Sequence, residues 1–108
     1  MLSNYREAPH KLLFSISLKM RQLLAARVCI DSKSGSSVLM DICNIRHEFQ
    51  ARFLLDTARK MTLTDCRDAV LHCAATACEL NSSPEPEARL KELIAKLAYS
   101  KVLRINDI

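Results

Sequence analysis

Apolar residues recur at spacings of three and four through most of the chain, which is the pattern of amphipathic helices. The first run follows Pro9, a residue accepted in the first turn of a helix, and continues to about residue 30. Its core side carries Leu12, Leu13, Ile16, Met20, Leu23, Leu24 and Ile30. A second apolar stripe, on roughly the opposite side, consists of Phe14, Leu18, Ala25 and Cys29. We expect this helix to be central or to bury the second stripe as a dimer or partner face.

Small polar residues around the only glycine, in segment 31–36, predict the end of the first helix. Ser36 or Ser37 can cap a second helix. The apolar positions of that helix are Val38, Leu39, Ile42, Ile45, Phe49 and Phe53. We expect it to run to about Met61, so that two long helices joined by a short loop form an antiparallel hairpin roughly 35 Å long.

Two shorter helices are predicted after the hairpin. Thr62 and Asp65 have the spacing of a capping box and begin the first of them. One of its faces carries Leu63, Cys66, Val70, Cys73 and Ala77. Ser83 as the cap and Pro84 as the first residue predict the other, with the apolar side Leu90, Leu93, Ile94, Leu97, Ala98 and Val102.

The expected fold is therefore all-α, a single domain over residues 1–108 with a helical hairpin (1–61) followed by two shorter helices (62–108). A chain of 108 residues buries only part of its apolar surface when folded alone. We therefore expect a helical-bundle homodimer.

Charge is unevenly distributed along the chain. Sixteen Lys and Arg against twelve Asp and Glu give a net charge of +4. Residues 1–60 hold ten basic and five acidic side chains, whereas residues 61–108 hold six basic and seven acidic ones. The predicted hairpin is thus the basic half of the chain and the candidate to meet an anionic partner.

Six cations of the hairpin are candidate phosphate contacts. Arg52 and Arg59 lie seven positions apart, so they share one side of the predicted helix. Guanidinium groups fit the phosphate fork and ammonium groups act as point charges, without reading a base sequence. The nucleic-acid-binding set is Lys11, Lys19, Arg46, Arg52, Arg59 and Lys60. Ordinary solvation of a helix surface, partly neutralised by nearby acids, explains the same residues.

Catalytic and metal-binding patterns are weak. Cys66, His72, Cys73 and Cys78 lie in one predicted helix, but they contain no C-x-x-C pair and point in different directions, so we read Cys66 and Cys73 as packing residues. The odd number of cysteines, five, favours a reducing compartment, and we expect a cytoplasmic protein without an enzymatic activity, a cofactor, a metal or a membrane span. A mitochondrial targeting role for the basic residues 1–30 is the alternative.

Segments 39–43 (LMDIC), 49–52 (FQAR) and 57–61 (TARKM) resemble the short nodavirus non-structural protein that suppresses RNA silencing by binding double-stranded RNA. The resemblance covers about residues 10–75. It implies a homodimer whose paired hairpins form a four-helix bundle and lie along duplex RNA. Such a surface contacts the backbone independently of sequence.

Two functions are therefore expected. The first is sequence-independent binding of double-stranded RNA, as in a viral suppressor of RNA silencing. The alternative is a non-enzymatic adaptor, chaperone or inhibitor that binds a protein through the exposed apolar stripe containing Phe14 and Leu18.

Overall fold

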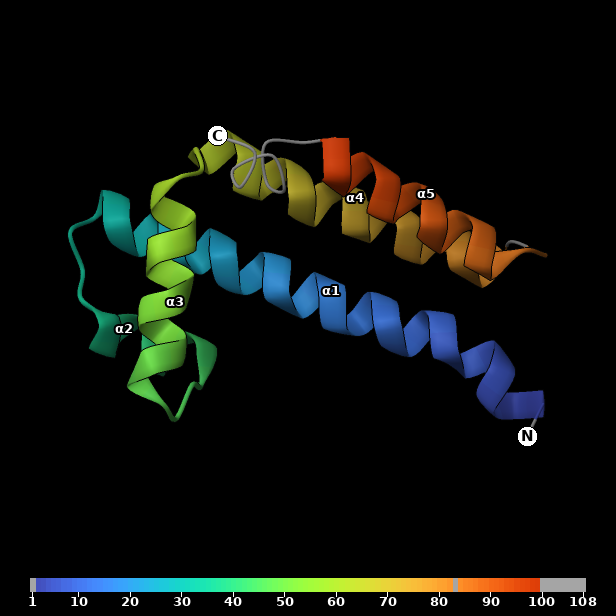
Figure 1. Cartoon of the computed structure of the whole chain (residues 1–108), viewed down its shortest axis with the longest axis horizontal. Helices are drawn as coiled ribbons and strands as arrows, with labels where there is room; N and C mark the ends of the chain where they lie inside the picture. The colour runs from blue at the N-terminus through green and yellow to red at the C-terminus, as the bar shows by residue number, and fades with distance from the viewer. Residues whose placement is uncertain (1, 83, 100–108) are drawn as a thin grey trace.

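A computed structural model of the chain describes the backbone of residues 2–82 and 84–99 and the side chains of residues 8–82 and 84–97. Figure 1 shows this part of the chain as five helices joined by short connections, which confirms the predicted all-α fold. In chain order they are α1 (Leu2–Asp31), α2 (Ser36–Cys43), α3 (Glu48–Arg59), α4 (Leu63–Ser82) and α5 (Pro86–Tyr99).

Helix α1 is the central element. It begins at Leu2 and contains Pro9, so the prediction that the helix starts at this proline is wrong. A proline inside a helix removes one backbone hydrogen bond, and here the ring is buried. The predicted end of the helix is confirmed at Asp31. The turn that follows places Lys33 at φ 60° and lets the N–H of Ser34 donate to the carbonyl of Cys29 at 2.7 Å, a Schellman ending.

The predicted second helix is two helices. Asn44 adopts the left-handed conformation (φ 54°, ψ 46°), and the N–H of Ile45 donates to the carbonyl of Met40 at 2.9 Å, which closes α2. Helix α3 starts afresh at Glu48. The long second helix is therefore wrong, and residues 2–61 do not form a hairpin of two long helices. A cap by Ser36 or Ser37 is also wrong, because Gly35 is the N-cap of α2 and no side chain bonds there.

Helix α4 packs antiparallel along α1. Its buried residues recur at spacings of three and four: Cys66, Ala69, Cys73, Thr76 and Leu80. Cys66 lies near Arg27 and Asp31 late in α1, whereas the Cys73 thiol is hydrogen-bonded to Ser17 in its middle. Most of these side chains are small. The packing role predicted for Cys66 and Cys73 is confirmed.

The capping box at the start of α4 is confirmed. The N–H of Thr62 donates to Asp65 Oδ2 at 3.1 Å, and the N–H of Asp65 donates to Thr62 Oγ1 at 3.0 Å. Each side chain thus satisfies a backbone donor that the helix leaves unpaired.

Helix α5 lies beside α4 (Figure 1). It begins at Pro86, so the prediction that it begins at Pro84 is wrong; segment 84–85 is not helical. Leu90, Leu93 and Leu97 are buried as predicted, but Ile94 is exposed. The proposed cap Ser83, the side chain of Ala98 and Val102 lie outside the described residues.

Arg27 joins α1 to the end of α3. Its guanidinium donates to the carbonyls of Ala58 (3.2 Å) and Met61 (3.0 Å) and pairs with Asp31 at 2.6 Å. Helix α3 thereby crosses the C-terminal half of α1 steeply, with α2 beside it (Figure 1). Among the described residues, no helix has both the length and the apolar character that crossing a bilayer requires.

Several residues of the predicted apolar helix faces are exposed. They are Leu12, Val38, Ile42, Phe49, Phe53, Leu63 and Ala77. The core consists instead of α1 residues between Leu13 and Cys29, Leu39 of α2, the inner sides of α3 and α4, and the three leucines of α5.

Candidate functional site

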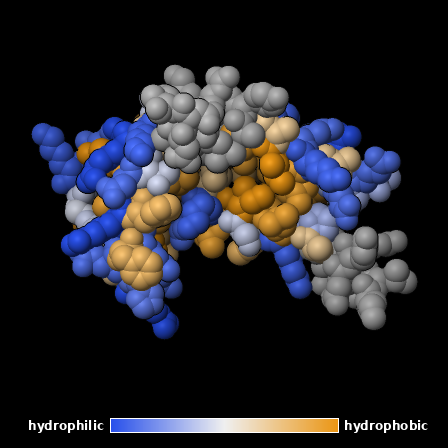
Figure 2. Space-filling model, viewed as in Figure 1, coloured by the Kyte–Doolittle hydropathy of each residue, from blue (hydrophilic) through white to orange (hydrophobic). Residues whose placement is uncertain are grey.

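An apolar groove runs between the N-terminal half of α1 and helix α3. Its volume is about 560 Å³. It is lined by Phe14, Ser15, Leu18, Lys19, Gln22, Ile45, Phe49, Gln50, Phe53 and Leu54. We call this feature the α1–α3 groove. Figure 2 shows apolar atoms on the exposed surface of α3, at the left of the molecule.

Each wall of the α1–α3 groove carries a pair of exposed apolar side chains four residues apart. Phe14 and Leu18 of α1 are 69% and 46% exposed, and Phe49 and Phe53 of α3 are both 68% exposed. A spacing of four places both members of a pair on one helix face. The ring of His47 lies 5.7 Å from that of Phe49, so the N-cap residue of α3 lies against the first of the two phenylalanines. The groove thus has an apolar ridge on each of its two walls.

Charges around the groove are of one sign. Lys19 lines the groove, and the residues that line it include no acid. Arg46 and Lys60 flank α3 at its two ends, and both are exposed. The two acids of α3 form ion pairs on the adjoining face of the helix, where Glu48 pairs with Arg52 at 3.0 Å and Asp56 pairs with Arg59 at 2.6 Å. The apolar ridges therefore lie within a cationic rim.

A second, polar cleft lies on the other side of α3. It has a volume of about 470 Å³ and lies against the α1–α2 connection. Its lining includes the cations Lys33, Arg52 and Arg59 and a single acid, Asp56. Lys33 comes from the turn after α1, where its positive φ belongs to the helix ending. We call this feature the basic cleft.

All six predicted phosphate contacts are exposed, but the structure divides them. Arg52 and Arg59 line the basic cleft, and Lys19 lines the α1–α3 groove. Arg46 and Lys60 lie at the ends of α3, and Lys11 lies on α1. Because α3 crosses α1 steeply, these cations do not form the single flat face expected from a hairpin.

The predicted dimer or partner stripe of α1 is only half on the surface. Phe14 and Leu18 are exposed, Ala25 is half-buried, and Cys29 is buried in the core. The second half of α1 is covered within the chain because α3 packs on it. Only Phe14 and Leu18 therefore remain available to a partner.

Three of the cysteine thiols, those of Cys43, Cys66 and Cys73, have raised pKa values. Burial raises the pKa of the Cys66 thiol to about 11, and it also raises the pKa of Cys73, which Ser17 and Arg21 partly offset. Burial and the neighbouring Cys29 raise the pKa of Cys43. A raised pKa keeps a thiol protonated and unreactive. Within residues 8–82 and 84–97, no group of three or more His, Cys, Asp or Glu side chains is placed to hold a metal ion.

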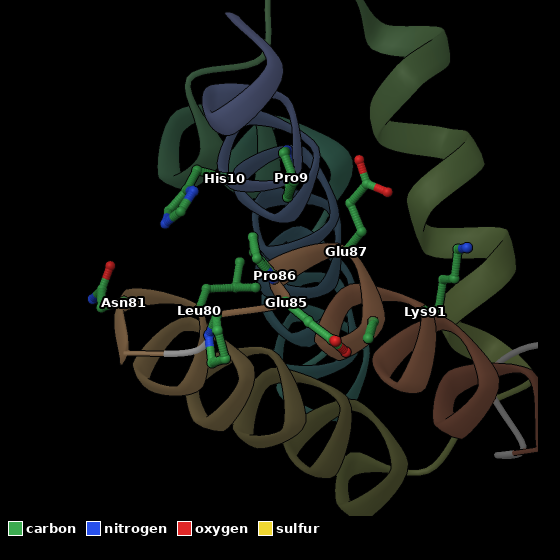
Figure 3. Close-up of a pocket in the computed structure, with 10 residues that line it drawn as sticks. Pro9, His10, Leu80, Asn81, Glu85, Pro86, Glu87 and Lys91 are labelled. Atoms are coloured by element: carbon green, nitrogen blue, oxygen red, sulfur yellow. The ribbon is translucent and has the colours of Figure 1, made fainter. Parts of the chain in front are cut away.

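A further hollow, of about 850 Å³, lies where α1, the end of α4 and the start of α5 meet (Figure 3). Pro9 and His10 face it from α1, Leu80 and Asn81 from α4, and Pro86 from α5. Glu85, Glu87 and Lys91 bring charges of both signs to the same hollow. A mixed, largely exposed lining of this kind gives no preference for one ligand chemistry.

Three residues of these sites were misread or missed from the sequence. Phe49 and Phe53 were predicted only as apolar positions of one helix, although the same spacing is typical of a partner-binding ridge. Lys33 was passed over because it belongs to a polar loop and not to a periodic stretch.

Comparison with known proteins gives no relative from which a role could be transferred. The nodavirus resemblance therefore stays a prediction from the sequence. No protein-family model, curated protein or solved structure matches the chain.

Proposed function

We propose that this chain is a non-catalytic protein-binding module that accommodates a helix of its partner in the α1–α3 groove. The observation that carries the proposal is the convergence of four exposed apolar side chains, Phe14 and Leu18 with Phe49 and Phe53, on one groove. A contiguous apolar surface rimmed by polar residues is typical of interaction sites. An apolar ridge on each wall of a groove suits an amphipathic helix, whose apolar residues recur at three and four.

The energetic argument is the cost of leaving these side chains in water. Burying a phenylalanine or leucine side chain is worth about 1.5–3 kcal/mol. Three phenylalanines and a leucine at one site therefore supply enough free energy to offset part of the association entropy. Aromatic residues are also the residues that most often dominate binding interfaces.

The test is a titration of the full chain, isotope-labelled for NMR, with a synthetic amphipathic helix that carries a leucine stripe and glutamines elsewhere. We expect saturable binding with shifts concentrated at the four apolar residues. The double variant Phe49→Ser/Phe53→Ser should lose it. The matched control Val38→Ser/Ile42→Ser removes exposed apolar residues of α2 and should bind normally. Absent binding, or shifts centred away from the groove, would overturn the proposal.

A second candidate function is the binding of double-stranded RNA by a homodimer, as the resemblance implies. The observation that favours it is the gathering of Lys33, Arg52 and Arg59 around the basic cleft. Cations on a rigid surface bind the phosphates of duplex RNA through counterion release. The ion pairs of both arginines with neighbouring acids reduce the available charge, which is why we rank it second.

The RNA function is tested with an RNA duplex, single-stranded RNA and a DNA duplex at two salt concentrations. If it holds, duplex RNA binds preferentially and the triple variant Lys33→Gln/Arg52→Gln/Arg59→Gln lowers the salt dependence by up to about three charges. The control variant Lys96→Gln removes an exposed cation of α5 and should leave binding unchanged. An absence of binding at low salt rejects this function.

A further inference from the structure

We infer that the helix accommodated by the α1–α3 groove is acidic, with glutamate or aspartate on both flanks of its apolar stripe. This inference rests on the proposed protein-binding function and adds the chemistry of the partner. It follows from the charges around the groove and from the position of the acids of α3.

The cationic rim has no internal counterion. Lys19 lines the groove, and Arg46 and Lys60 stand at the two ends of α3. None of the three forms an ion pair with another residue whose side chain the structure describes. The residues that line the groove include no acid. Lys19 in the lining and Arg46 and Lys60 at the ends of α3 are therefore three cations without an ion pair among the described side chains.

The acids nearest in sequence to Arg46 and Lys60 already form ion pairs with other residues. Glu48 accepts from Arg52, and also from the hydroxyl of Ser36 at 3.5 Å, whereas Asp56 accepts from Arg59. Phe49 and Phe53 lie on one face of α3, and Arg52 and Asp56 lie on the adjoining face that borders the basic cleft. Helix α3 thus has one neutralised charged face beside a face that is apolar between cations.

The same charges disfavour a second copy of this chain as the occupant. A two-fold dimer through the groove brings the same surface of each copy together. Lys19, Arg46 and Lys60 of one copy would then approach the same cations of the other. Like charges placed opposite one another cost free energy and suppress the wrong partner. The carboxylates of an acidic helix would instead attract these three cations.

The length of α3 gives the expected length of the partner segment. Helix α3 has 12 residues, which at about 1.5 Å per residue gives a wall of roughly 18 Å. The partner segment should therefore be about 12–15 residues long, with three apolar anchors at i, i+3 or i+4 and i+7. Acids on both sides of that stripe then reach Lys19 on one wall and the two ends of α3.

The experiment compares three peptides of about 15 residues that share one leucine stripe and carry glutamate, glutamine or lysine at the flanking positions. Fluorescence anisotropy with the full chain gives the three dissociation constants at low and high salt. We expect the glutamate peptide to bind at least about tenfold more tightly than the lysine peptide, and the difference to shrink as salt screens the rim. The triple variant Lys19→Gln/Arg46→Gln/Lys60→Gln should abolish the preference while the glutamine peptide still binds.

Lys96→Gln is the single-substitution control. It removes an exposed cation of α5 and should preserve the preference for the glutamate peptide over the lysine peptide. Equal binding of all three peptides would overturn the acidic partner and leave the protein-binding function standing. If no peptide binds, the proposed function fails as well. Sedimentation then separates two cases: a dimer that Phe49→Ser/Phe53→Ser dissociates assigns the groove to a second copy, and a monomer leaves it without an occupant.

Discussion

The guanidinium of Arg27 donates a hydrogen bond to the backbone carbonyl of Met61, a residue 34 positions later, at 3.0 Å. A second bond reaches the carbonyl of Ala58. The carbonyl of Ala58 also accepts from the N–H of Met61 at 3.1 Å, and Met61 itself lies just beyond the last residue of α3. One half-buried side chain of α1 therefore holds the end of α3, and with it the position of the groove wall that carries Phe49 and Phe53.

Replacing Arg27 should destabilise the fold more than replacing any surface arginine. In Arg27→Met, the carbonyls of Ala58 and Met61 and the carboxylate of Asp31 lose the guanidinium, although Ala58 still accepts from the N–H of Met61. Hydrogen bonds to charged groups are worth about 1.5–3 kcal/mol each. The side chain is 20% exposed, so water compensates in part, and we expect a loss of about 2 kcal/mol in the free energy of unfolding. Urea denaturation followed by circular dichroism measures it.

Arg27→Lys should recover little of this loss, because an ammonium group cannot reach three acceptors in the geometry of a guanidinium. Arg89→Met is the control. Arg89 pairs only with Glu92 on the surface at 3.2 Å, and the change should cost less than about 0.5 kcal/mol. A similar loss in the Arg27 and Arg89 variants would contradict the role given to Arg27.

The sequence predicted most of the helical content, and it missed the joint between α2 and α3. The apolar spacing of three and four over residues 38–53 continues across the break between α2 and α3. The same spacing therefore fits either one long helix or two short ones. The signal was Asn44, since asparagine is the residue after glycine that most readily adopts the left-handed conformation closing a helix. At the other helix end the glycine drew attention instead, although Lys33 takes the positive φ and Gly35 does not.

Asn44 should tolerate glycine and little else. With φ at 54°, Asn44→Gly should keep or slightly raise the stability of the fold. Asn44→Val places a β-branched side chain in the left-handed region and should lower it by about 1–2 kcal/mol. Thermal unfolding of the two variants gives the comparison, and a valine variant as stable as the glycine one would show that α2 does not end in this way.

The capping box gives a smaller effect of known sign. Thr62→Ala removes the acceptor for the N–H of Asp65 and should cost about 1 kcal/mol. Thr62→Ser keeps the hydroxyl and should restore most of it. Thr64→Ala, which changes an exposed residue in the first turn of α4, is the control. Unfolding by urea distinguishes the variants, and equal stability of the alanine and serine variants would rule out the capping role.

The groove was predictable in part only. The exposed pair on α1, Phe14 and Leu18, was identified because that helix carried more apolar residues than one core face needs. Its counterpart on α3 was not, because periodicity records that residues share a face but not what covers that face. Steep crossing of α1 by α3 joins the two pairs, and that angle depends on long-range contacts such as those of Arg27.

Removing the apolar ridge of α3 should leave the fold intact. Phe49 and Phe53 are each 68% exposed, so Phe49→Ser/Phe53→Ser should change the free energy of unfolding by less than about 0.5 kcal/mol per site. The binding of a hydrophobic fluorescent dye to the native protein should fall at the same time, since the dye reports exposed apolar surface. Leu54→Ser changes a buried neighbour in α3 and should unfold the protein, so it provides the contrast. A large loss of stability in the double serine variant would mean that the phenylalanines belong to the core.

The buried thiol of Cys66 should make the fold sensitive to alkaline pH. Burial raises its pKa from the ordinary value of 9.0 to about 11, so the folded state holds this proton more tightly than the unfolded chain does. The stabilisation from the neutral thiol is therefore complete below pH 9 and is lost as the pH rises towards 11. By linkage, the loss is on the order of 2 kcal/mol.

Urea unfolding of the wild-type chain and of Cys66→Ala, measured under reducing conditions across this pH range, isolates the effect from other groups that titrate there. The alanine variant should be less stable near neutral pH, because it leaves a small cavity in a fully buried site. Its stability should nevertheless fall less steeply between pH 9 and 11. Cys78→Ala removes an exposed thiol and should retain the wild-type slope. Parallel slopes for wild type and Cys66→Ala would show that the Cys66 thiol titrates as freely in the folded chain as in the unfolded one.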